Sequence, residues 1–323
     1  MTSSGGPRVG RRTAVLAAVG AAAAAAGLSG CVSARGTDPD RTPAAAERRR
    51  PRRHSYGDHA AQFGDLYLPD RGRPLATVVL LHGGFWQAQY GLDLAAGLAP
   101  DLADRGYAAW NLEYRRVGDG GGWPATFTDV ARGIDLLGDL ADRTGESLYP
   151  TLAIGHSAGG QLAVWAAGRH RLPSGAPGAA PKVRLAAAIS QAGVLDLTAA
   201  ARDGVGGGSV EALLGGPPEA HPRRYAWASP LTRVPIGVPV CCLHSPADAL
   251  VPIDQSRRYV RAATAAGDHA TLVETDGDHF ALIDPASPGW RTAVDQLPGL
   301  LRPGAHPTHP THPGGRGHRR PGT

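Results

Sequence analysis

A single serine stands between glycines at residues 155–159, which read Gly-His-Ser-Ala-Gly. Residues 151–154 before it are apolar and residues 161–167 after it have a helical pattern, so the segment predicts a strand that turns sharply into a helix. Such a turn is strained, and a side chain on either flanking glycine would collide where strand and helix pass close together. The turn makes Ser157 a candidate nucleophile, and the amide of Ala158 beside it can stabilise an oxyanion. The alternative is that the serine is only the small residue of a tight turn.

Candidate partners for the serine follow in the order Asp, then His. Asp248 comes after the apolar run 238–243, and His279 comes after the short strand-like run 271–274. In this arrangement the histidine takes the proton of the serine hydroxyl, and the aspartate holds and stabilises the imidazolium. The alternatives are a helix-capping aspartate and a solvated loop histidine. The position of His279 after the last strand distinguishes it from the other histidines of the chain.

A glycine pair at the end of another apolar run is placed to supply further oxyanion contacts. Residues 76–81 are β-branched and aliphatic, the pattern of a strand buried on both faces, and His-Gly-Gly-Phe-Trp follows. We expect the amides of Gly83, Gly84 and Phe85 to form an oxyanion hole together with that of Ala158. The neighbouring histidines, at 82 and 156, are expected to hydrogen-bond loop backbone.

Three aromatic residues near the predicted strand ends are candidates for a substrate pocket. They are Trp86, Tyr114 and Trp123. The alternative is that these side chains only pack against the core, as aromatic residues near the end of a sheet also do.

The order of the elements predicts the fold class. Apolar strands alternate with helical patterns, which indicates an α/β protein with a mostly parallel, doubly wound sheet between two helical layers. One domain is expected over residues 54–302. Expected helices cover 93–105, 127–141, 161–168, 253–266 and 290–300, and further strands cover 108–112 and 185–189. Adjacent Cys241 and Cys242 should point to opposite faces of a strand as free buried thiols.

These motifs and their order resemble the α/β-hydrolase superfamily, in the group that holds bacterial esterases, feruloyl-esterase-like domains and kynurenine-formamidase-like enzymes. The matching segments are 82–86, 111–115, 122–127, 155–159, 213–216 and 228–230, with Asp248 and His279. The resemblance spans residues 64–300. It implies the α/β-hydrolase fold and acyl transfer to water, with no metal and no organic cofactor. Phe85 replaces the third glycine of the family's His-Gly-Gly-Gly loop and would narrow the acyl side of the pocket.

The expected function is therefore a serine hydrolase that cleaves carboxylic esters of small acyl or aryl groups through an acyl-enzyme. An arylformamidase or amidase is the alternative, because of the Trp-Pro-Ala-Thr-Phe run at 123–127. A non-catalytic surface binding protein on a hydrolase scaffold is a third class, and the complete Ser-Asp-His set argues against it. The expected partner is a small ester or amide. Acyl length, natural substrate and oligomeric state are left open by the sequence.

The beginning of the chain predicts export. Three arginines before residue 13 precede the apolar stretch 13–28, and residues 28–31 read Leu-Ser-Gly-Cys. A basic region, an apolar region and small residues before a cut describe a secretory signal, here residues 1–30. The ending resembles a bacterial lipobox. This resemblance implies that Cys31 is acylated and that the lipid anchors the protein to the cell membrane, with the folded domain outside the cell. An ordinary secretory signal or a retained anchor helix is the alternative, and both twin-arginine and Sec export are open.

Charge is distributed unevenly along the chain. Of 33 basic and 28 acidic residues, residues 1–53 hold ten and three, and residues 302–323 hold four and none, so 54–301 carries a net charge of −6. The folded part therefore gives no sign of nucleic-acid binding. Residues 31–53 are predicted to be a disordered tether that lies against anionic lipid, and residues 303–323 a disordered His/Pro-rich tail.

Overall fold

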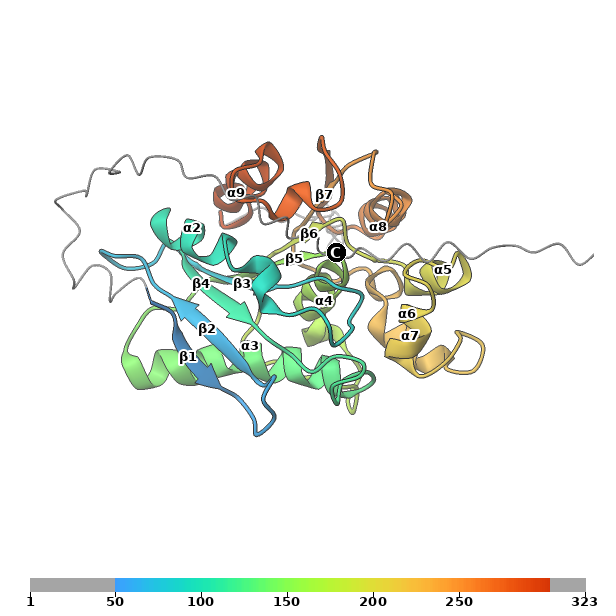
Figure 1. Cartoon of the computed structure of the whole chain (residues 1–323), viewed down its shortest axis with the longest axis horizontal. Coiled ribbons are helices and arrows are strands. Elements are labelled where there is room, and N and C mark those ends of the chain that lie inside the picture. The colour runs from blue at the N-terminus through green and yellow to red at the C-terminus, as the bar shows by residue number, and fades with distance from the viewer. Residues whose placement is uncertain (1–49, 303–323) are drawn as a thin grey trace, which may run out of the picture. The chain divides into compact units, whose positions relative to one another are not determined.

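One sheet of eight strands organises residues 50–302, the part of the chain that the computed structural model describes (Figure 1). The strand order is β1-β2-β4-β3-β5-β6-β7-β8. The pairs β1–β2 and β2–β4 are antiparallel, and all other neighbours are parallel. The strands are β1 Arg52–Ser55, β2 Phe63–Tyr67, β3 Thr77–Leu81, β4 Ala108–Leu112, β5 Thr151–His156, β6 Ala188–Gln191, β7 Val240–His244 and β8 Ala270–Glu274. The expected mostly parallel, doubly wound sheet is confirmed.

Helices cover both faces of this sheet. The α-helices are α2 Leu98–Asp104, α3 Ala125–Thr144, α4 Ala158–Ala167, α5 Leu197–Arg202, α6 Ser209–Leu214, α7 Pro222–Ala228, α8 Asp254–Ala265 and α9 Pro288–Leu300. Short 3-10 helices are η1 Leu92–Ala95, η2 Arg169–Arg171, η3 Pro230–Arg233 and η4 Ala281–Ile283. In Figure 1, α2 and α9 lie on one side of the sheet and α3 lies on the other. None of the helices within the described range combines the length and apolarity needed to cross a membrane.

Two apolar cores, one on each face, hold the layers together. Along β3, Val79 and Leu81 join the core shared with α3 and α4, whereas Val78 and Leu80 join the core shared with α2 and α9. All four side chains are almost completely buried. Because successive side chains point to opposite faces, a slip of one residue would exchange the two cores, so burial on both faces fixes the register.

The adjacent cysteines of β7 follow the same rule. Cys241 belongs to the α2/α9 core and Cys242 to the α3/α4 core, and both thiols are free. Burial raises the pKa of the Cys241 thiol. The expectation of two buried free thiols on opposite faces is confirmed.

The sheet begins earlier than expected. Arg52 and Arg53, assigned from sequence to the tether, are the first residues of β1. The guanidinium of Arg53 makes two hydrogen bonds of 2.8 Å to the carboxylate of Asp65 and lies 3.8 Å from the ring centroid of Phe63. Both partners are on β2, so two contacts between strands draw this arginine into the fold. The signal segment 1–30, Cys31 and the tail 303–323 lie outside the described residues.

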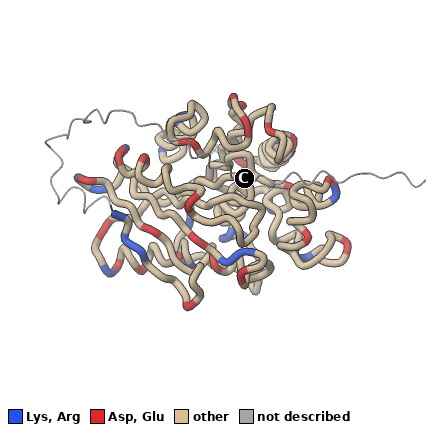
Figure 2. Tube along the Cα trace, in the orientation of Figure 1, with Lys and Arg blue, Asp and Glu red and all other residues tan. Residues whose placement is uncertain are grey.

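Other elements differ from the expected pattern. The helix expected over 93–105 is divided into η1 and α2, and the strand expected over 185–189 is displaced to β6. The helices α5, α6 and α7 were not predicted; they are six or seven residues long, too short for a clear periodicity. Figure 2 shows acidic and basic residues interspersed along the trace of the described part.

Candidate active site

Ser157 lies at the sharp turn between β5 and α4. Its backbone has φ 55° and ψ −118°, a conformation that costs free energy for any residue other than glycine. The two flanking glycines make the turn possible. A Cβ atom on Gly155 would lie 2.0 Å from the carbonyl oxygen of Gly159, and a Cβ on Gly159 would lie 2.0 Å from the carbonyl oxygen of Leu81. Strand β5 and helix α4 therefore pass as close to each other as the sequence predicts, and the end of β3 packs against the same turn.

The loop after β3 lies directly against this turn. A Cβ atom on Gly83 would stand 3.1 Å from the Cβ of Ser157, so only glycine leaves the space between them open. Gly84, Phe85 and Trp86 follow with φ values of 103°, 50° and 56°. Three successive residues in the left-handed region turn the chain sharply. Within residues 50–302, the amides of Gly84, Phe85 and Ala158 donate to no protein acceptor.

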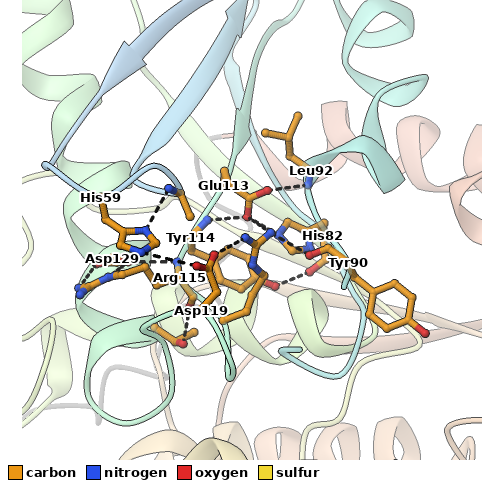
Figure 3. A network of polar contacts seen from close by, with 12 residues as sticks. His59, His82, Tyr90, Leu92, Glu113, Tyr114, Arg115, Asp119 and Asp129 are labelled. Atoms are coloured by element: carbon orange, nitrogen blue, oxygen red, sulfur yellow. Dashed lines mark hydrogen bonds and ion pairs between the residues drawn. The ribbon is translucent and has the colours of Figure 1, made fainter. Parts of the chain in front are cut away.

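A buried carboxylate at the end of β4 holds this loop in place (Figure 3). One oxygen of Glu113 lies 2.9 Å from Nε2 of His82, and the other accepts the amide of Leu92 at 3.0 Å. Tyr114 stacks on the ring of His82, with centroids 4.3 Å apart, and donates its hydroxyl hydrogen to the carbonyl of His82. Arg116 lies 3.0 Å from the carboxylate of Glu113. Strand β4 thereby positions the first residue of the glycine loop.

The pKa values in this cluster follow from burial and hydrogen bonding. Burial by itself would raise the pKa of Glu113, but the hydrogen bond from His82 and those from the amides of Tyr114 and Leu92 outweigh it and lower the pKa. Burial raises the pKa of Tyr114. The glutamate is therefore ionised and the tyrosine neutral near pH 7. Sequence reasoning missed Glu113, although its place directly after a buried strand was a usable signal.

Asp248 and His279 come together at the ends of β7 and β8. Nδ1 of His279 lies 2.6 Å from Oδ2 of Asp248, and both side chains are buried. The other carboxylate oxygen accepts the amides of Leu250 and Val251 at 2.8 and 2.9 Å. With Nδ1 donating to the carboxylate, neutral His279 presents Nε2 as an acceptor. The pair thus has the geometry of an oriented base.

A second histidine supports the aspartate. His244, at the end of β7, places Nε2 2.9 Å from the carbonyl oxygen of Val251 and 3.4 Å from Oδ2 of Asp248, while its Nδ1 lies 2.8 Å from Oγ of Ser256. Burial by itself would raise the pKa of Asp248, but the hydrogen bonds from His244 and His279 prevail and hold the pKa well below its usual range. This supporting role of His244 was not predicted from the sequence.

His156 connects the histidine loop to the serine turn. Its Nε2 lies 2.9 Å from the carbonyl oxygen of His279, and the two rings are 4.5 Å apart between centroids. Burial, with repulsion from His279, lowers the pKa of His156 to about 3, so the ring is neutral near pH 7. Among the described residues, Oγ of Ser157 makes no hydrogen bond to His279; such contacts are often long before a substrate is bound.

The aromatic residues predicted for the pocket separate into two groups. Trp86 and Tyr114 are completely buried, so the expectation that they line an open pocket is wrong and the packing alternative holds. Trp86 donates from Nε1 to Oε1 of Gln161 at 3.1 Å, which anchors the end of the glycine loop on α4. Trp123 is partly exposed and lines a cavity beside α7.

Asp278 directly precedes His279 in the chain, but its carboxylate binds backbone amides of its own loop. One of its oxygens accepts the amides of Phe280 and Ala281 at 3.0 Å each, which shapes the chain into η4. In the described part of the chain, the carboxylate of Asp278 makes no hydrogen bond or ion pair with the imidazole of His279. The carboxylate that meets His279 is that of Asp248.

Comparison with known proteins places this geometry in context. The model of the BD-FAE family matches residues 64–262, more than half of the chain. No curated protein matched the chain in sequence.

Among solved structures, a truncated carbohydrate esterase from gut microbiota has a TM-score of 0.65 at 19% identity, and the alignment covers 79% of this chain and 98% of that protein. A thermophilic esterase from the Planctomycetes species Thermogutta terrifontis, Est2, has a TM-score of 0.63 at 20% identity, covering 79% and 92%. A bifunctional GH43-CE protein of Bacteroides eggerthii has 0.65 at 24%, covering 77% and 38%. These likenesses establish the α/β-hydrolase fold.

Proposed function

The chain belongs to the BD-FAE family, and from that premise we propose that it is a serine hydrolase of carboxylic esters. The observation that carries the proposal is the 2.6 Å contact between His279 and Asp248, in a loop that His156 joins to the turn holding Ser157 at φ 55°. A base oriented by a buried carboxylate next to a strained serine is the arrangement that activates a hydroxyl for attack on a carbonyl.

In the proposed reaction, Nε2 of His279 takes the proton of Ser157 as Oγ attacks the ester carbonyl. The amides of Gly84, Phe85 and Ala158 donate to the oxyanion; in residues 50–302 they have no protein acceptor and are therefore free to do so. The tetrahedral intermediate collapses, the C–O bond to the alcohol breaks, and His279 returns its proton to that alcohol. Water then gives a proton to His279 as its oxygen attacks the acyl carbonyl. The bond between the carbonyl carbon and Oγ breaks, His279 returns the proton to Oγ, and the acid is released.

The neutral state of His156 favours this cycle. When His279 becomes an imidazolium, a second positive ring 4.5 Å away would oppose it, but burial keeps His156 uncharged above about pH 3. The ionised carboxylate of Asp248 stabilises the imidazolium at the same time.

The side chain of Phe85 is proposed to restrict the acyl group. It occupies the position after the glycine pair with φ 50° and packs against Gly206, where a Cβ atom would lie 2.4 Å from the phenyl ring. The ring is thereby held between the glycine loop and the segment before α6. We expect small acyl groups to be accepted better than long ones.

A substrate panel on the full chain tests the function. We expect hydrolysis of p-nitrophenyl acetate, with kcat/KM decreasing as the acyl chain lengthens, and weaker or no cleavage of N-formylkynurenine. Ser157→Ala should abolish both turnover and labelling by a fluorophosphonate while leaving the thermal unfolding curve in place. Wild-type turnover in that variant would contradict the serine mechanism, and a preference for the formamide would favour the arylformamidase alternative.

A further inference from the structure

A cavity of about 440 Å³ opens beside α7, and of the residues assigned to the candidate active site only the pocket candidate Trp123 lines it. Its walls include Trp123, His221, Arg223, Arg224 and Trp227. None of these belongs to the serine turn, the glycine loop or the Asp-His pair. The volume is within the range of small-molecule sites, roughly 300–1,000 Å³.

One wall of the cavity is aromatic and firmly supported. The rings of Trp123 and Trp227 lie 6.3 Å apart between centroids at an angle of 39°, and both side chains are partly exposed. Trp123 also packs on Phe127 at 5.2 Å. Behind Trp227, Nε1 of Trp165 donates to the carbonyl of Trp227 at 3.1 Å. The packing of the two indoles on each other, and of Trp123 on Phe127, restricts their rotation, so little order has to be gained when a flat ring packs against them.

The other wall is basic. Within residues 50–302, neither Arg223 nor Arg224 has a carboxylate in ion-pair contact. Arg224 donates from Nη1 to the carbonyl of Leu214 at 2.8 Å, which fixes its direction. The guanidinium of Arg223 lies 5.8 Å from the ring centroid of Trp227. The nearby Glu219 is paired with Arg202 at 3.0 Å. Two guanidinium groups at the edge of an aromatic surface are suited to bind a ligand that carries a carboxylate on or near an aromatic ring.

We propose that this cavity is a binding site for an aromatic carboxylate. The ring of the ligand packs against the tilted indoles of Trp123 and Trp227, and its carboxylate accepts hydrogen bonds from Arg223 and Arg224. Both interactions are needed, since a cation–π contact orients the guanidinium while the charge-assisted hydrogen bonds hold the anion. The site is independent of the proposed ester hydrolysis, because binding of a free acid requires neither Ser157 nor His279.

The test is calorimetric titration of the full-length Ser157→Ala variant with 4-hydroxycinnamate. We expect saturable one-site binding. The corresponding amide removes the charge and cyclohexanepropionate removes the aromatic ring, and each should bind at least about tenfold more weakly, a difference of about 1.4 kcal/mol. No saturable binding of the acid, or equal binding of the acid and its amide, would overturn the proposal.

Variants locate the bound acid. Arg223→Gln combined with Arg224→Gln, and separately Trp227→Leu, should each weaken binding by about tenfold or more. The matched control is Arg132→Gln combined with Arg261→Gln, which removes the same charge from two exposed positions on α3 and α8 and should leave binding unchanged. Arg223→Gln alone changes only an exposed side chain, so it should also weaken binding without loss of the fold. Unchanged affinity in both cavity variants would place the acid elsewhere, the active site included, and refute the assignment.

Discussion

At the scale of single residues, the carboxylate of Asp248 is held from two directions. Amides of its own loop bind one oxygen, and His279 and His244 approach the other at 2.6 and 3.4 Å. The hydrogen bonds outweigh burial and keep the pKa of Asp248 below its usual range, so the group is ionised near pH 7. A carboxylate that cannot rotate and does not become protonated fixes the tautomer of His279.

Replacing that carboxylate should remove activity without removing the fold. We predict that Asp248→Asn lowers kcat for p-nitrophenyl acetate by about 10⁴, with a small change in KM, because the amide keeps the shape but no longer fixes the tautomer. Steady-state kinetics provides the measurement. The control is Asp278→Asn, whose side chain only accepts the amides of Phe280 and Ala281 and should retain activity within a few fold. If Asp278 proved to be the critical acid, the assignment of Asp248 would be wrong.

At the scale of elements, the ends of two neighbouring parallel strands, β3 and β4, together position the glycine loop. β3 ends in the glycine loop, and β4 ends in Glu113, whose carboxylate reaches back to His82. Leu81 and Leu112 are paired in register, which brings the two strand ends to the same level. The glycines leave room for the serine turn, while the charged and aromatic side chains of the next strand supply the stiffness that glycines lack.

Loss of this support should affect the reaction more than substrate binding. In Glu113→Gln, an NH₂ group replaces one of the two carboxylate oxygens, each of which now faces a donor. One buried donor is then left without an acceptor, so the free energy of unfolding should fall by about 1–3 kcal/mol. We expect kcat to fall by up to about 10²–10³, the effect of losing one oxyanion donor, with KM changed much less.

The control for this prediction lies at the exposed end of the same network. Asp119 makes an ion pair of 2.9 Å with Arg116 but does not touch the glycine loop. Asp119→Asn should therefore leave kcat near the wild-type value. Denaturant unfolding and kinetics on both variants decide the matter, and unchanged kcat in Glu113→Gln would refute a positioning role for this glutamate.

At the scale of the whole molecule, stability depends on keeping His156 neutral. Burial lowers its pKa to about 3 in the folded protein, whereas an unfolded chain binds the proton near the ordinary value of about 6.5. Between these values the unfolded state binds more protons, so the free energy of unfolding decreases as the pH falls, by about 1.4 kcal/mol per pH unit.

Urea unfolding measured from pH 7 to pH 4.5 should reveal this dependence. We predict a shallower slope for His156→Gln than for the unchanged protein. Burial also lowers the pKa values of His54 and His170, so part of the slope should persist. Equal slopes for the two proteins would show that His156 is not the main proton-linked group in this range.

Location is also a property of the whole chain. We propose that Cys31 is acylated and that two acyl chains hold the protein at the membrane, since one chain binds only marginally. Cys31→Ser should leave kcat/KM unchanged while activity moves from the membrane fraction into the medium, or an uncleaved precursor accumulates. Mass spectrometry of the purified N-terminus provides the direct measurement, and an unmodified Cys31 or cleavage at another residue would contradict the proposal.

Much of the candidate site was accessible from sequence because its residues follow strands. Ser157, Asp248 and His279 each come after an apolar run, and the carboxyl ends of parallel strands meet at one edge of a sheet. The pocket aromatics were less accessible. A tryptophan and a tyrosine near strand ends have the same sequence pattern whether they line a cavity or fill the core, and Trp86 and Tyr114 fill the core.

The sequence by itself determined the order of the parallel strands and of the longer helices, the serine turn and the candidate acid and base, because periodicity, glycine placement and strand ends are local properties of the chain. Only the tertiary structure decided what supports those residues. Glu113 meets His82 because β4 pairs with β3, and His244 meets Ser256 because α8 packs on β7. The cavity between Trp123 and Arg223 exists because α7 folds back beside the start of α3. Such contacts join residues far apart in the chain, and no pattern within one segment encodes them.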